Sequence, residues 1–97
     1  MSFKNHLLED MRLVVLRTLS EMSSYRLNSS VLHSFITRYG HSFSRDQLRT
    51  ELHWLAEQGL IVIEENIENV LVVKLTERGV DVASGLVITH GVKRPSA

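Results

Sequence analysis

The chain has 97 residues, 43% of them hydrophobic, a size that fits one small globular domain rather than two. Its 11 Lys and Arg residues balance 11 Asp and Glu residues, so the formal net charge is zero. This balance excludes a protein that binds nucleic acid through a strong overall positive charge. The ordinary apolar fraction also argues against a disordered acidic chain.

The chain contains no cysteine. Disulfide scaffolds, cysteine-based zinc sites, iron–sulfur clusters and thiol catalysis are therefore excluded. The first residues form a charged helical pattern without the apolar run or cleavage site of a secretory signal, and no apolar run is long enough to span a membrane. We therefore expect a cytoplasmic protein that has no membrane partner.

Apolar residues at steps of three and four predict a first helix over residues 5–22. The apolar face is wide, which indicates a helix buried in a small core or one that also meets a second subunit; we favour burial. The face holds Leu7, Leu8, Met11, Val14, Val15, Leu16, Leu19 and Met22.

Two further helices are predicted from their end signals. After a short extended segment over residues 25–27, Asn28 is a good N-cap for a helix over residues 29–39, which Gly40 ends. Ser44 and Gln47 have the spacing of a capping box, which predicts a third helix from there to Gln58. The buried face of this third helix is expected to hold Leu48, Leu52 and Leu55, with Trp54 and Ala56 at its edge.

After Gly59 the apolar period changes from helical to strand-like. Residues 60–64 and 70–75 predict two strands, and the polar residues 65–69 predict the turn of a β-hairpin between them. Thr76 is expected to cap a last short helix that ends near Gly85. We therefore predict an α+β domain over residues 1–85 and a flexible C-terminal tail over residues 86–97.

Three helices followed by a hairpin and a helix form a pattern that resembles the winged helix-turn-helix domains of bacterial and phage transcription regulators. Two stretches carry the resemblance, a junction from helix to strand and a Thr-capped step after the hairpin: Leu52-His53-Trp54-Leu55-Ala56-Glu57-Gln58-Gly59-Leu60-Ile61 and Leu75-Thr76-Glu77-Arg78-Gly79. Both patterns have structural reasons, so they indicate a fold more than a function.

As a whole, the chain is similar to small proteins of Mu-like prophages that are labelled arsenical-repressor-like. The similarity lies in residues 40–60 and in the ending Gly91-Val92-Lys93-Arg94-Pro95. The resemblance implies a phage setting and a winged helix, without a defined activity. The metal-sensing cysteines of true arsenical repressors are absent, so metal sensing does not carry over.

In a winged helix, the third helix lies in the DNA major groove. Helical spacing places Arg45, Arg49 and His53 on one line, with Gln47 and Thr50 beside it. Arginine can contact guanine through two hydrogen bonds, and glutamine can contact adenine in the same way. These residues are therefore candidates for reading DNA.

Three more residues could hold the phosphate backbone. Ser44 and the first N–H groups of the third helix could bind a phosphate, and Lys93 and Arg94 could reach DNA as a flexible arm. Each group also has an alternative interpretation. The helix could simply expose a solvated polar face whose arginines pair with neighbouring carboxylates, and the tail could only add solubility.

The predicted turn weighs against DNA binding. Glu64, Glu65 and Glu68 lie in or beside it, and no basic residue accompanies them, so it would repel a phosphate backbone. The favoured function is a small winged-helix protein that binds double-stranded DNA in transcriptional regulation or phage DNA handling. The alternative is a winged-helix module that binds a phage protein in a replication or packaging assembly.

Further expectations concern assembly and chemistry. We expect a homodimer, because one small neutral domain buries too little contact area for tight specific binding; the first helix is the favoured interface and the last helix the second choice. The five histidines lack the spacing and companions of metal ligands, and no catalytic motif is present. We therefore expect no metal, no cofactor and no enzymatic activity.

Overall fold

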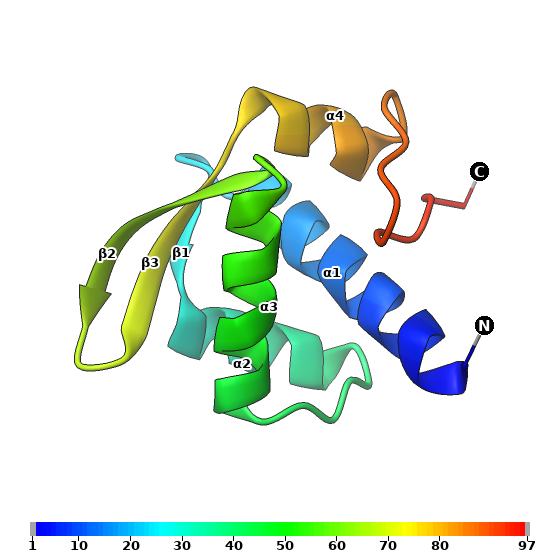
Figure 1. Cartoon of the computed structure of the whole chain (residues 1–97). Coiled ribbons are helices and arrows are strands. Elements are labelled where there is room, and N and C mark those ends of the chain that lie inside the picture. Colours follow the sequence, from blue (N-terminus) through cyan, green and yellow to red (C-terminus); the bar gives the residue numbers. More distant parts are fainter. Residues whose placement is uncertain (1, 97) are drawn as a thin grey trace.

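The computed structural model describes residues 2–96; Met1 and Ala97, at the ends of the predicted domain and tail, lie outside the described residues. The prediction of an α+β fold is confirmed, because four helices pack with one three-stranded antiparallel sheet (Figure 1). In chain order the elements are α1 (Phe3–Glu21), β1 (Arg26–Asn28), α2 (Ser29–Arg38), α3 (Arg45–Glu57), β2 (Ile61–Ile67), β3 (Val70–Leu75) and α4 (Glu77–Ser84).

Each of these helices begins at a polar side chain that accepts a hydrogen bond from the backbone N–H three residues later. The four caps are Ser2, Asn28, Ser44 and Thr76. Three of them were predicted, and the capping box of α3 is complete because the Gln47 side chain also accepts from the Ser44 N–H. The fourth cap, Ser2, explains why α1 begins two residues before its predicted start.

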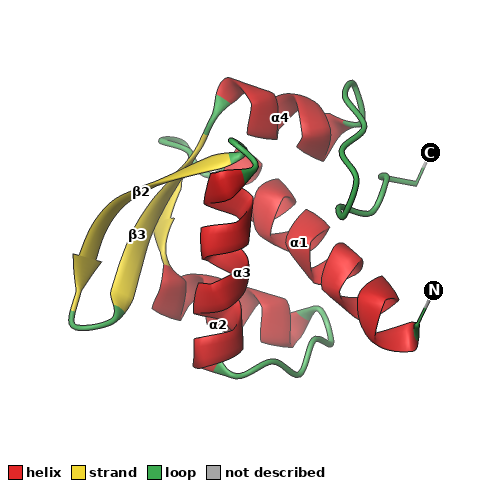
Figure 2. Ribbon diagram, in the orientation of Figure 1, coloured by secondary structure: helices red, strands yellow, loops and turns green. Residues whose placement is uncertain are grey.

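The sheet has the strand order β1-β3-β2, so β3 lies in the middle. The strand β1 pairs with β3 over three residues, which confirms the short extended segment expected before α2. The Leu71 N–H donates to the Ser29 hydroxyl at 3.0 Å, which joins the start of α2 to the middle of the sheet. The sheet lies at one side of the molecule, and the helices fill the other (Figure 2).

The hairpin turn is shorter than the predicted range of residues 65–69. The strand β2 continues to Ile67, and only Glu68 and Asn69 connect it to β3. Both turn residues have positive φ angles, 51° and 67°, as a two-residue type I′ turn requires. Asparagine adopts this conformation readily, whereas for glutamate it is unfavourable by about 1 kcal/mol, which is why no turn signal stands at this point of the sequence.

The apolar face of α1 is the centre of the core. Met11, Val15, Leu16 and Leu19 are fully buried, and α1 contacts α2, α4 and β3. The preference for core burial over a subunit contact is therefore confirmed for this face. The rest of the buried apolar set comes from all four helices, the two longer strands, the link before β2 and the segment after α4: Leu13, Leu32, Ile36, Leu48, Leu52, Leu55, Leu60, Ile61, Leu71, Val73, Leu75, Val82, Ala83 and Val92.

Gly79 explains the Thr-capped step that follows the hairpin. A Cβ atom at this position would lie 2.1 Å from the carbonyl oxygen of Leu60 and 2.5 Å from a methyl carbon of Leu75. No larger residue fits without moving α4 away from the base of the hairpin. This close approach lets α4 pack on α1, where Val82 and Ala83 are buried.

Candidate nucleic-acid interface

The buried face of α3 determines which of its side chains meet solvent. Leu48, Leu52 and Leu55 are fully buried, as predicted. With 100° per residue, the direction opposite to these leucines falls on a ridge of four exposed residues rather than on the predicted line of arginines. The ridge consists of Asp46, Thr50, His53 and Glu57.

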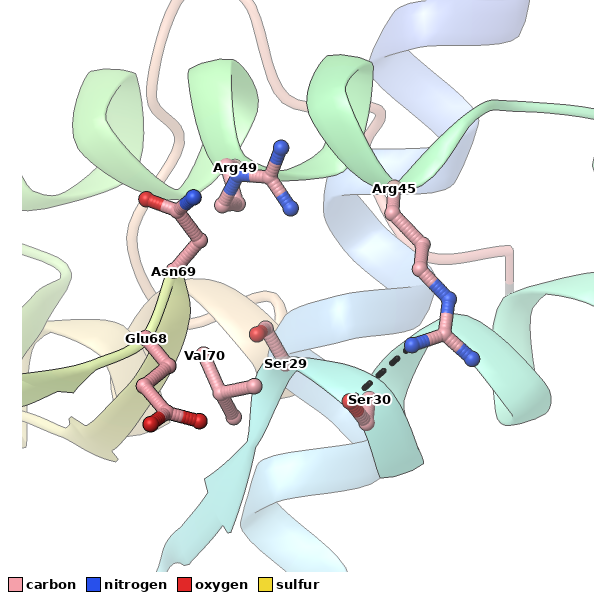
Figure 3. Close-up of a pocket in the computed structure, with 7 residues that line it drawn as sticks. All are labelled: Ser29, Ser30, Arg45, Arg49, Glu68, Asn69 and Val70. Atoms are coloured by element: carbon pink, nitrogen blue, oxygen red, sulfur yellow. Dashed lines mark hydrogen bonds between the residues drawn. The ribbon is translucent and has the colours of Figure 1, made fainter.

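Arg45 and Arg49 lie on the flank of α3 that faces the hairpin. Both border a cleft of about 110 Å³, and Figure 3 shows how three elements enclose it. Ser29 and Ser30 come from the start of α2, and residues 68–70 come from the hairpin turn. The cleft therefore brings together side chains from three separate stretches of the sequence.

The two arginines are only loosely held. An Arg45 N–H donates to the Ser30 hydroxyl at 3.4 Å, near the limit of a hydrogen bond. Arg49 pairs with Asp46 at 3.3 Å, but the Asp46 side chain is 86% exposed, so solvent screens the pair. Both guanidinium groups keep most of their donor capacity for a ligand.

Other predicted site residues of α3 lie elsewhere on its surface. Gln47 and Thr50 border a separate hollow between α3 and the start of α1, on the side away from the hairpin. The Ser44 hydroxyl and the side-chain amide oxygen of Gln47 accept hydrogen bonds in the capping box, and the Thr50 hydroxyl donates to the backbone carbonyl of Asp46. His53 is exposed on the ridge. The structure thus places Arg45 and Arg49 beside the hairpin and the other predicted candidates of α3 elsewhere on its surface.

The hairpin is acidic, but one of its carboxylates is neutralised. Glu64 on β2 reaches across β3 and accepts two hydrogen bonds from the Arg26 guanidinium of β1, the longer one at 3.1 Å. This hydrogen bonding holds the pKa of Glu64 below its ordinary value, and nearby Lys74 acts in the same direction. Glu65 and Glu68 are exposed without such a partner among residues 2–96.

The segment after α4 has defined contacts, although the sequence predicted a flexible tail over residues 86–97. Thr89 and Val92 are buried, and the Lys93 N–H donates to the Glu9 carbonyl at 3.1 Å. The Lys93 ammonium lies 3.4 Å from Asp10. The flexibility of the segment after α4 stays a prediction. Its contacts place it along α1, across α3 from the hairpin (Figure 1). Arg94 is exposed beside it.

Partly buried interactions hold this segment and α1 to α3 and to the loop before it. Arg12 of α1 donates to Glu51 at 2.7 Å and to the Gly91 carbonyl at 2.8 Å, and its guanidinium carbon lies 3.9 Å from the ring centroid of Trp54. Nearby, the buried His41 ring is 2.7 Å from Asp10, the partner of Lys93. Trp54 is therefore a packing residue at the edge of the core, as predicted.

Sequence reasoning found Arg45 and Arg49 but missed Ser30, Glu68 and Asn69 on the same cleft. No spacing in the sequence joins these residues, because the cleft forms only when the hairpin turns back toward α2. Among residues 2–96, no group of three or more His, Asp or Glu side chains could hold a metal ion. Within the same range, every helix is too short or too polar to cross a membrane.

The comparisons with known proteins give the chain a family. No family model and no solved structure matches it. Two relatives match over most of their length. The uncharacterised protein gp26 of Escherichia phage Mu is 47% identical over 89 residues, 92% of this chain and 91% of that protein. An uncharacterised protein of Haemophilus influenzae is 47% identical over 78 residues, 80% of this chain and 76% of that protein. The resemblance to Mu-like proteins is confirmed, although neither name mentions a repressor or a winged helix. The chain belongs to the family of the phage Mu protein gp26.

Proposed function

We propose that this chain is a winged-helix protein that binds double-stranded DNA through the hairpin-facing side of α3, in transcriptional regulation or phage DNA handling. The topology supports the fold assignment. The helices α2 and α3 follow each other through a short connection, and the hairpin β2–β3 begins directly after α3, which is the order of a helix-turn-helix with a wing.

One observation carries the function: Arg45 and Arg49 lie exposed or half-exposed beside the hairpin and have only weak partners. Guanidinium groups in this state can bind phosphate oxygens or guanine edges. Ser44, Gln47, Thr50 and His53 would contact DNA only where it extends over the ridge of α3. Lys93 and Arg94 lie farther away, across α3 from the hairpin, and would contact DNA last.

A salt titration of binding to a mixed-sequence DNA duplex tests this function. Wild type should bind at low salt, and the logarithm of its affinity should fall linearly with the logarithm of salt concentration. Replacing Arg45 and Arg49 by alanine should reduce the slope by about one for each arginine that binds a phosphate. Arg17→Ala removes an exposed charge from α1, outside this surface, and serves as the matched control. Absence of binding by wild type, or an unchanged slope in the double variant, contradicts the proposal.

A second function is a protein-binding winged helix in a phage replication or packaging assembly, and the charge of the α3 ridge favours it. Asp46 and Glu57 occupy the centre of the exposed face, and Glu65 and Glu68 extend the negative charge along the hairpin. Such a surface suits a basic protein partner. The variant Asp46→Asn with Glu57→Gln separates the two functions. It should raise DNA affinity if this ridge faces DNA, whereas a module that binds a protein without DNA contact should bind the duplex neither as wild type nor as this variant.

The homodimer stays a prediction that goes with the DNA-binding function. Because the apolar face of α1 is used in the core, the exposed apolar residues after α4, Leu86 and Ile88, offer an alternative interface. Light scattering at micromolar concentration should give the mass of two chains. The double variant Leu86→Ser with Ile88→Ser should then give the mass of one, whereas a monomeric wild type removes the dimer from the proposal.

A further inference from the structure

The cleft beside α3 brings two positive charges to one small space. Arg45 and Arg49 line it from α3, the Ser30 hydroxyl faces them from α2, and the Asn69 amide points toward α3 from the hairpin turn (Figure 3). The volume of about 110 Å³ is enough for a group the size of a phosphate. All of these side chains carry hydrogen-bond donors, which match the oxygens of an anion.

The state of the two arginines distinguishes this cleft from a structural ion pair. Arg12, on the other side of α3, has a carboxylate and a carbonyl at less than 3 Å and an aromatic ring against it. Arg45 forms no ion pair with any residue between 2 and 96, and the partner of Arg49 is 86% exposed. A ligand would therefore displace little to reach either guanidinium.

A third charge lines the same cleft. Glu68 stands in the hairpin turn with a φ angle of 51°, a conformation that glutamate rarely adopts, and its carboxylate points away from the arginines. The charged side chains that line the cleft, two guanidinium groups and one carboxylate, carry a net charge of +1; the exposed Asp46 carboxylate that pairs with Arg49 lies outside the lining. This charge balances the single negative charge of a phosphodiester better than the nearly double charge of a terminal phosphate.

We propose that this cleft binds one phosphodiester group of a nucleic-acid backbone through Arg45 and Arg49, and that Glu68 gives the cleft its preference for a singly charged phosphate. The proposal rests on the proposed function only for the source of the phosphate. It assigns the two arginines to the backbone rather than to a base edge, so they position the chain on DNA and do not read its sequence.

The first experiment measures phosphate binding without DNA. Backbone amide resonances of the full chain are followed by NMR while dimethyl phosphate, a diester, or inorganic phosphate is added at constant ionic strength with chloride as the reference. The amides of Ser30 and Asn69 should shift with saturation for dimethyl phosphate. Arg45→Ala and Arg49→Ala should each weaken this binding about tenfold, because each removes a charge-assisted contact.

The same titration includes a control variant with an arginine removed outside the cleft. Arg17→Ala should bind dimethyl phosphate like wild type, and the undisturbed amide spectrum of each variant shows that it is folded. Shifts no larger than those that chloride causes overturn the proposal. Equal affinities of wild type and both arginine variants overturn it as well.

Glu68→Gln tests the origin of the charge preference. It removes the carboxylate and keeps the shape and backbone conformation of the turn. The ratio of inorganic phosphate affinity to dimethyl phosphate affinity should rise about two- to fivefold at low ionic strength, as expected for one charge near the site. Glu65→Gln removes a charge from β2 outside the cleft and should leave the ratio unchanged. If both variants change it equally, Glu68 has no special role and that part of the proposal fails.

The proposal and the DNA-binding function can fail separately. Saturable dimethyl phosphate binding without binding to any duplex supports the cleft and overturns the function. Duplex binding that depends on Arg45 and Arg49, without saturable binding of dimethyl phosphate, supports the function and overturns the cleft. If both hold, Arg45→Ala should weaken binding to unrelated duplexes by the same factor, whereas a large difference between duplexes would assign Arg45 to a base and overturn the backbone assignment.

Discussion

Arginine side chains lie on both sides of α3, and the environments of these side chains differ sharply. On the side of α1 and the C-terminal segment, Arg12 is 13% exposed and joins Glu51, Trp54 and Gly91 in one packed cluster. On the side of the hairpin, Arg45 and Arg49 border an open cleft and have partners at 3.3–3.4 Å. A guanidinium group that is saturated by its own chain contributes to stability, whereas an unsaturated one is available to a ligand.

This difference separates the packed side of α3 from the side that we propose to bind DNA. The packed side fixes the position of α3 against α1 and the C-terminal segment. The open side then presents its two charges from a rigid helix, beside a hairpin whose register is fixed by the sheet. Rigid presentation lowers the cost of ordering side chains when a ligand binds. The packed side therefore supports the open one without contacting the ligand.

The largest expected effect comes from Arg12→Ala. Loss of this side chain leaves the half-buried Glu51 carboxylate without its partner and removes the contact with Trp54. The free energy of unfolding in urea should fall by about 2–3 kcal/mol. Arg45→Ala, its counterpart on the other flank, should change it by less than about 0.5 kcal/mol. Similar losses in the two variants would erase the distinction between the flanks.

Gly91→Ala tests how tightly the C-terminal segment is held on the packed side. Its Cβ would lie 2.7 Å from the Trp54 ring, at a φ angle of 93°. Gly40 has nearly the same φ angle, 89°, and a Cβ atom added there would meet open space, so Gly40→Ala measures the backbone cost alone. We expect Gly91→Ala to cost about 1–2 kcal/mol more than Gly40→Ala in thermal unfolding. Equal costs would show that the segment moves aside freely.

A smaller effect is expected where α1 meets the loop before α3. Asp10→Ala leaves the His41 ring, only 5% exposed, without its hydrogen-bond partner. The free energy of unfolding should fall by about 1 kcal/mol. Lys93→Ala removes only the exposed partner of the same carboxylate and should cost less than about 0.5 kcal/mol. A larger loss from Lys93→Ala would assign the anchoring of this side to the C-terminal segment instead.

The smallest effect belongs to the hairpin side, at Glu64. The hydrogen bond from Arg26 lowers the pKa of Glu64 in the folded chain. The pair therefore contributes its stability above the ordinary pKa of 4.5 and loses it as the pH falls through the lower folded value. The Tm of wild type should slightly exceed that of Glu64→Gln at neutral pH, and the two should converge well below pH 4.5. A difference that persists there would assign the effect to packing.

Local signals in the sequence were sufficient for the helices. Caps at Asn28, Ser44 and Thr76 and the apolar period of Leu48, Leu52 and Leu55 are properties of neighbouring residues, and the structure confirms them. The period of the leucines also determines which side of α3 faces solvent, and the predicted line of arginines did not take this into account. The direction opposite to the three leucines already pointed to Asp46 and Glu57 rather than to Arg45.

Contacts between distant residues were beyond such reasoning. Arg12 donates to the carbonyl of Gly91, which lies 79 positions farther along the sequence, and no local pattern near either residue predicts this contact. The turn was predicted too long because Glu68 adopts a left-handed conformation that its residue type disfavours, so only the pairing of β2 with β3 limits the turn to two residues. The cleft depends on both the turn and the start of α2, and it could not be predicted before either was placed.

The strand order of the sheet has a consequence for contacts between separate molecules. With the strand order β1-β3-β2, the sheet ends in a strand of three residues on one side and in β2 on the other, where the register shifts between Ile63 and Glu65. Open sheet edges are the places where separate molecules join into aggregates. A very short strand, an interrupted ladder and two adjacent carboxylates each obstruct that joining. The carboxylates of this hairpin therefore disfavour edge-to-edge pairing of separate molecules, whatever their effect on DNA binding.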